Sequence, residues 1–249
     1  MRKEILAGAC ALFALWLLAG CLTSNSGPAA KTESVQYASG NFTVNGLLCQ
    51  PANPSGKAVA VVLTGGDGVS LGALRPVCET FAGLGLTALA HDNVNGTIGD
   101  NVQAVADALA YLQNRFPSMP RALWAHSSGT IYSAFAAYEQ RNITAFVETS
   151  GHFQIPLCDR PSDNPPPGGC AAYLEDFPAP VLVVHGAADN VVNVSYANAF
   201  ASRLLSLGIP YNKIIVPGAG HEFMTDRAWV ADDEAAFIRQ QPYNETADS

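Results

Sequence analysis

Apolar runs of strand length alternate with helical patterns along most of this chain, and this alternation constrains the fold more than any other feature. The apolar runs lie at 58–63, 86–90, 122–125, 143–148, 181–185 and 213–216. Helical patterns lie at 73–84, 101–115, 129–140, 196–207 and 227–239. Strands that are apolar throughout are buried on both faces, so the series predicts an α/β fold with a mostly parallel central sheet and helices on both faces. Residues 35–50 instead alternate polar and apolar side chains, which predicts antiparallel edge strands.

The first twenty residues are typical of an export signal. Arg2 and Lys3 precede an apolar run at 5–18 that ends at Leu18-Ala-Gly-Cys21. The last four residues resemble the lipobox of bacterial lipoproteins, which implies that Cys21 is acylated and becomes the membrane-anchored N-terminus. We therefore expect residues 1–20 to be a signal peptide and the protein to be an exported, membrane-anchored lipoprotein of the bacterial cell envelope. An uncleaved membrane helix is the alternative, although the run is shorter than the about 20 residues that span a bilayer. A cleaved soluble form is a second alternative.

The remaining chain is predicted to form one domain behind a flexible tether. Residues 21–34 are rich in Ser, Thr, Gly, Pro and Ala, a composition that cannot fold alone. Residues 35–249 are long enough for a single α/β domain, and we expect a monomer. The formal net charge of −8 argues against nucleic acid as a partner, because phosphate binding needs clustered Lys and Arg.

The cysteines predict disulfides. Of the six, Cys10 lies in the signal and Cys21 at the anchor, which leaves four in an exported domain. These four allow three pairings. We expect Cys158 to pair with Cys170, since both lie in one Pro- and Gly-rich loop predicted to be a short lid, and Cys49 with Cys78. Alternatively, Cys49 is a small buried apolar residue of a strand.

Three motifs supply the side chains that acyl transfer requires. Ser127 lies in Ala-His-Ser-Ser-Gly directly after an apolar run, Asp189 ends His-Gly-Ala-Ala-Asp after another, and His221 ends Gly-Ala-Gly-His after the last. A serine hydroxyl needs a histidine to accept its proton and a carboxylate to orient that histidine. Because ligands bind beyond the carboxyl ends of parallel strands, we expect all three side chains at that edge of the sheet.

Each of these assignments has a rival. Ser128 could be the nucleophile, but Thr130 would then stand where a small residue is needed. Ser127 could instead be a helix N-cap, and the Asp189 side chain could serve only its own turn. Glu148, at the end of the preceding strand, is the rival acid.

Together the motifs resemble those of the α/β-hydrolase superfamily, in particular its dienelactone-hydrolase-like and cutinase- or polyester-hydrolase-like members. Ala125 replaces the first glycine of the usual G-x-S-x-G, and Ser127 stands where dienelactone hydrolases have another nucleophile. The resemblance implies Ser127 as nucleophile, His221 as general base and Asp189 as its acid. It also implies an oxyanion hole formed by the backbone N–H of Ser128 and that of Gly66 or Asp67, in a glycine-rich loop whose alternative is a plain turn.

These residues predict a serine hydrolase that cleaves small or polymeric carboxylic esters through an acyl-enzyme, without a cofactor. The alternatives are an amidase, peptidase or acyltransferase with the same residues, or a non-catalytic binding protein on this fold. His91, His126, His152 and His185 also lie near strand ends, but none of them has the helical spacing of zinc hydrolases. We therefore expect no metal site.

Overall fold

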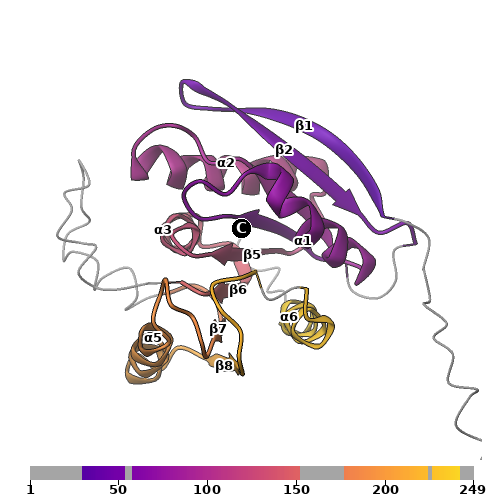
Figure 1. The fold of residues 1–249 in the computed structure, drawn as a ribbon. Helices are drawn as coiled ribbons and strands as arrows, with labels where there is room; N and C mark the ends of the chain where they lie inside the picture. Colours follow the sequence, from indigo (N-terminus) through magenta and orange to yellow (C-terminus); the bar gives the residue numbers. More distant parts are fainter. Residues whose placement is uncertain (1–29, 54–57, 152–176, 224–225, 242–249) are drawn as a thin grey trace, which may run out of the picture.

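The structure, a computed structural model, describes residues 30–53, 58–151, 177–223 and 226–241. In these residues eight strands form one sheet in the order β1-β2-β4-β3-β5-β6-β7-β8 (Figure 1). The strands are β1 (Lys31–Ser39), β2 (Phe42–Gln50), β3 (Ala60–Thr64), β4 (Thr87–His91), β5 (Arg121–His126), β6 (Ile143–Thr149), β7 (Val181–Gly186) and β8 (Tyr211–Val216). The helices are α1 (Leu71–Gly83), α2 (Ile98–Arg115), α3 (Gly129–Gln140), α5 (Ser195–Ser206) and α6 (Ala228–Gln240).

The sheet contains both parallel and antiparallel pairs of strands, as the sequence predicts. The six strands β4-β3-β5-β6-β7-β8 run parallel to one another, whereas β2 pairs antiparallel with both β1 and β4. Every residue of β3, β4, β5 and β7 is buried, because helices cover both faces of the parallel part. The predicted α/β class and the predicted antiparallel edge are therefore confirmed.

The helices lie on two sides of the sheet and enclose two apolar cores. Helices α2, α3 and α5 pack on one face, where Val105, Ile131 and Phe200 belong to one buried cluster. Helices α1 and α6 pack on the other, where Phe81 and Ile238 belong to a second cluster (Figure 1). Because helices cover both faces of the sheet, a ligand can approach it at the carboxyl ends of the parallel strands.

The tether was predicted four residues too long. Residues 31–34, expected in the tether, form the start of β1 and pair with residues 47–50 of β2. Three of these four residues are exposed, so they carry no apolar pattern that would indicate a strand. Their backbone hydrogen bonds to β2 extend the sheet, and such pairing is a tertiary contact that local composition does not encode.

Several predictions lie outside the described residues. These are the export signal, the Cys21 anchor, and the lid loop with its Cys158–Cys170 pair. Among the residues that the structure does describe, no helix has the length and apolarity needed to cross a bilayer. The described part also contains no cluster of three or more His, Cys, Asp or Glu side chains that could hold a metal ion.

A disulfide joins β2 to α1. Cys49 and Cys78 form this bond with their Cα atoms 5.7 Å apart, and both side chains are fully buried. The structure therefore contains the second predicted pair, and Cys49 is not simply a buried apolar residue. The bond closes a loop across 29 residues, and this loop includes β3 and the glycine-rich segment after it.

Removing this disulfide is expected to lower the free energy of unfolding by about 3.5 kcal/mol, since the cross-link restricts the unfolded chain. The comparison is between the parent and Cys49→Ala/Cys78→Ala in urea under oxidising conditions. Both proteins keep Cys158 and Cys170, and only the parent has the Cys49–Cys78 bond. A reducing agent should therefore destabilise the parent much more than the variant. Equal stability of parent and variant would show that the bond contributes nothing.

Candidate active site

Ser127 lies in a sharp turn between β5 and α3. Its φ angle of 55° is in the left-handed region, which non-glycine residues adopt rarely and mostly where the surrounding structure enforces it. The Ser127 N–H donates to Thr149 O at 3.0 Å, and its carbonyl accepts from the Thr130 hydroxyl at 2.7 Å. A Cβ at Gly129 would overlap the carbonyl oxygen of Gly65, so the position two residues after Ser127 requires glycine. These contacts hold the serine side chain above the end of the sheet.

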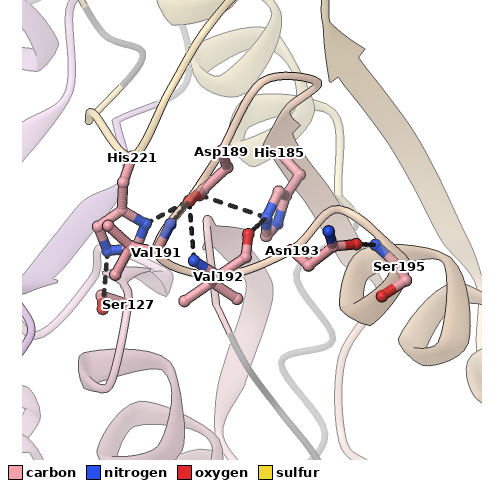
Figure 2. Close-up of polar contacts among 8 residues, drawn as sticks. All are labelled: Ser127, His185, Asp189, Val191, Val192, Asn193, Ser195 and His221. Atoms are coloured by element: carbon pink, nitrogen blue, oxygen red, sulfur yellow. Dashed lines mark hydrogen bonds and ion pairs between the residues drawn. The ribbon is translucent and has the colours of Figure 1, made fainter.

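His221 joins Ser127 to Asp189. Its Nε2 lies 3.1 Å from Ser127 Oγ, and its Nδ1 lies 2.8 Å from Asp189 Oδ2 (Figure 2). Asp189 follows β7 and His221 follows β8, so the three side chains come from three separate strand ends. With the proton on Nδ1, His221 donates to Asp189 and its Nε2 accepts from the serine hydroxyl, which is the arrangement that activates a serine.

Asp189 is fixed by its own loop. Its side chain is fully buried, and Oδ1 accepts from the backbone N–H groups of Val191 at 2.9 Å and Val192 at 2.8 Å. Burial alone would raise the pKa of the Asp189 carboxyl, but hydrogen bonds from His221 and from the two backbone N–H groups hold that pKa below its ordinary value. The carboxylate is therefore ionised and aimed at His221. His185 supports the same loop, because its Nε2 lies 2.8 Å from Val192 O and 3.4 Å from Asp189 Oδ2 (Figure 2).

The rival acid lies elsewhere. Glu148 is buried near the end of β6, and a Cβ on Gly151 would overlap its Oε1. Burial raises the pKa of Glu148 to about 8, although a hydrogen bond from the Gly151 backbone lowers it slightly. Its carboxyl is therefore largely protonated at neutral pH. The structure pairs His221 with Asp189 and not with Glu148.

The predicted oxyanion donors surround Ser127, but one of them is already engaged. A Cβ at Gly66 would lie 2.8 Å from Ser127 Cβ and 3.2 Å from Ser127 Oγ, so the glycine loop passes directly against the Ser127 side chain. The Asp67 N–H donates to Ser128 Oγ at 2.8 Å, and the Asp67 carboxylate accepts from the Tyr132 hydroxyl at 2.6 Å. Of the two expected loop donors, Gly66 or Asp67, the Asp67 N–H is engaged by Ser128 Oγ, which favours the N–H of Gly66.

Two neighbouring residues were missed or assigned no role from sequence. Asn93 Nδ2 donates to the carbonyl of Gly65 at 3.0 Å and to that of Gly66 at 3.1 Å, which positions the glycine loop beside Ser127. His126 packs its ring on His221 with the centroids 4.8 Å apart. Burial and the nearby His221 lower the pKa of His126 to about 3, so this ring is neutral. No motif indicated either contact, because both join segments that are distant in sequence.

Known proteins share this architecture. The structure resembles dienelactone hydrolase from Anabaena variabilis, with 20% identity, a TM-score of 0.68, and coverage of 86% of this chain and 99% of that one. An esterase from Pyrococcus furiosus has 16% identity, a TM-score of 0.69 and coverage of 85% and 93%. Acylaminoacyl peptidase from Pyrococcus horikoshii has 13% identity, a TM-score of 0.66 and coverage of 87% of this chain but 43% of its own.

Comparison by sequence alone matches a smaller part of the chain than comparison by structure. The profile of the prolyl oligopeptidase family matches residues 170–242, which include Asp189 and His221 but not Ser127. No curated protein matches the chain significantly in sequence. The fold is that of the α/β-hydrolases, as the sequence motifs predict. Within that fold the similar structures are of the dienelactone hydrolase, esterase and acylaminoacyl peptidase kind.

Proposed function

We propose that this protein is a serine hydrolase that cleaves carboxylic esters through a covalent acyl-enzyme. One observation carries the proposal: His221 bridges the Ser127 hydroxyl at 3.1 Å and the Asp189 carboxylate at 2.8 Å. In this arrangement the imidazole can accept the proton of the serine hydroxyl, which makes an otherwise weak nucleophile reactive.

The first half of the reaction forms the acyl-enzyme. Ser127 Oγ bonds to the ester carbonyl carbon while His221 Nε2 accepts the hydroxyl proton. The carbonyl oxygen becomes negative, and the N–H groups of Gly66 and Ser128 donate to it. When the C–O bond to the alcohol breaks, His221 returns the proton to the departing oxygen.

The second half releases the acid. A water molecule gives a proton to His221 Nε2 and bonds to the acyl carbon, and the Ser127–acyl bond then breaks as His221 protonates Oγ. The products are a carboxylic acid, an alcohol and the restored serine. Asp189 keeps its negative charge throughout and stabilises the imidazolium. Every atom comes from the ester, water and this chain, so the proposal includes no cofactor.

The proposed setting is the bacterial cell envelope. The lipobox-like Leu18-Ala-Gly-Cys21 supports a lipid anchor at Cys21, and the buried Cys49–Cys78 disulfide fits an oxidising compartment outside the cytoplasm. The acidic net charge of −8 supports neither nucleic acid nor other polyanions as substrates. In this proposal the enzyme is a monomer tethered to the membrane, and its substrate is a small or polymeric ester.

A second candidate is amide hydrolysis by the same three residues. It is favoured by the match of residues 170–242 to the prolyl oligopeptidase family and by the resemblance to an acylaminoacyl peptidase. The two activities share the nucleophile and differ in how well the site binds and protonates the leaving group.

The test compares p-nitrophenyl esters with p-nitroanilides that carry the same acyl group. For an esterase we expect kcat/KM for the ester to exceed that for the anilide by more than about two orders of magnitude. Comparable values would assign an amidase or peptidase instead. Folded protein without turnover of either series would favour a binding protein.

A further inference from the structure

A polar cavity of about 380 Å³ lies beside the loop that carries Gly66. Three segments line it: the start of β2 (42–45), the end of the glycine loop (68–70) and the residues after β4 (92–95). They meet because β2 runs antiparallel to β4, with Gly46 opposite His91, so the beginning of one strand adjoins the end of the other. The cavity therefore opens at the same edge of the sheet as the triad.

The cavity shares a wall with the reaction centre. Asn93 lines it and also donates to the carbonyls of Gly65 and Gly66, while the Gly66 backbone lies against Ser127. Gly68, two residues further along the same loop, lines the cavity as well. Ser127 and His221 are not among the lining residues, so the cavity is a neighbouring subsite.

The lining is rich in neutral hydrogen-bonding groups and contains no Lys or Arg. Its single ionisable side chain is Asp92, and Phe42, Val44, Val69 and Val94 contribute an apolar surface. Amide side chains both donate and accept hydrogen bonds, and hydroxyl side chains do the same. The polar lining residues are Thr43, Asn45, Ser70, Asp92, Asn93 and Asn95.

Part of this hydrogen-bonding capacity is unused. Asp92 uses Oδ1 to accept the Leu71 N–H at 2.8 Å, which leaves Oδ2 for a further donor. The cavity therefore suits a ligand that brings a hydrogen-bond donor to this carboxylate oxygen.

We propose that this cavity binds a hydroxyl-rich group, such as a sugar, attached to the ester that Ser127 attacks. The inference rests on the proposed esterase function and names its substrate class. A hydroxyl group donates to Asp92 Oδ2 and also accepts from the amide groups of Asn45 and Asn95. An ammonium group only donates, so it would leave those amide donors unpaired, and an alkyl chain would satisfy neither kind of group.

The kinetic test compares 6-O-acetylglucose with hexyl acetate in the full-length protein. We expect kcat/KM for the sugar ester to be higher by about tenfold or more, which corresponds to one or two additional hydrogen bonds. Asn95→Leu should raise KM for the sugar ester by about fivefold to tenfold while p-nitrophenyl acetate turnover stays unchanged. Asn212→Leu is the matched control, because Asn212 is exposed on β8 at the opposite edge of the sheet and should alter neither substrate.

A binding test separates the cavity from catalysis. Methyl glucoside is titrated into the Ser127→Ala protein while the side-chain amide resonances are followed by NMR, with shifts expected at Asn45, Asn93 and Asn95. Binding without any ester turnover by the parent would refute the proposed function and support the cavity. Acetylcholine is assayed as well, because it carries an ammonium group instead of hydroxyls. Absent NMR shifts, equal kcat/KM for 6-O-acetylglucose and hexyl acetate, or a higher kcat/KM for acetylcholine would each overturn the assignment of a hydroxyl-rich group.

Discussion

Replacing Ser127 by alanine is expected to lower kcat for ester hydrolysis by on the order of a millionfold, because the acyl-enzyme can no longer form. His221 would lose the hydroxyl 3.1 Å from its Nε2 and would have no proton to accept. The variant should fold normally. Ser127 already has a φ of 55°, and alanine carries no more strain at that angle than serine does.

The measurement combines kinetics with labelling. A fluorophosphonate probe should modify the parent at Ser127, identified by mass spectrometry, and should leave Ser127→Ala unmodified. Ser202→Ala is a matched control, because Ser202 is exposed on α5 and its hydroxyl donates to the Asn198 carbonyl of the same helix. Labelling or turnover that persists in Ser127→Ala would move the nucleophile elsewhere, with Ser128 as the first residue to examine.

Replacing Asp189 by asparagine is expected to lower kcat by about 10⁴-fold with a small change in KM. The asparagine amide can donate toward His221 Nδ1, which favours the tautomer with the proton on Nε2. That tautomer cannot accept the proton of Ser127. The side-chain oxygen of asparagine can still accept from the Val191 and Val192 N–H groups, so the loop and the urea unfolding midpoint should change little.

Glu148→Gln is the control for this substitution. It makes the same carboxylate-to-amide change in the other buried acid at the end of a neighbouring strand. Because burial raises the pKa of Glu148 to about 8, its carboxyl is already mostly neutral at pH 7, and the glutamine should preserve most of kcat. A large loss in Glu148→Gln together with a small one in Asp189→Asn would transfer the acid role to Glu148.

The elements that follow local rules could be predicted closely. Helix α3 begins at Gly129 and ends at Gln140, as its pattern predicts, and β6 differs from its prediction by one residue. The start of β1 was missed, since residues 31–34 are held by pairing with β2 rather than by their own side chains. Apolar periodicity reports burial, and an exposed edge strand has little of it.

The details of the site depended on contacts between distant segments. The sequence leaves Gly66 and Asp67 open as the second oxyanion donor, but Ser128, 61 residues further along the chain, supplies an acceptor for the Asp67 N–H. Asn93 was not singled out at all, although it binds two carbonyls of the oxyanion loop. Asparagine after a strand is common turn chemistry, so only its position in space reveals its role.

By itself the sequence determined the alternation of strands and helices and the chain order of Ser127, Asp189 and His221, because both are written in local pattern and spacing. The hydrogen bond between Asp189 and His221, the engagement of the Asp67 N–H and the cavity beside the loop were decided only by the tertiary structure. The physical reason is distance: a proton or a hydrogen bond passes only between atoms about 3 Å apart, and packing brings together atoms that the chain keeps far apart.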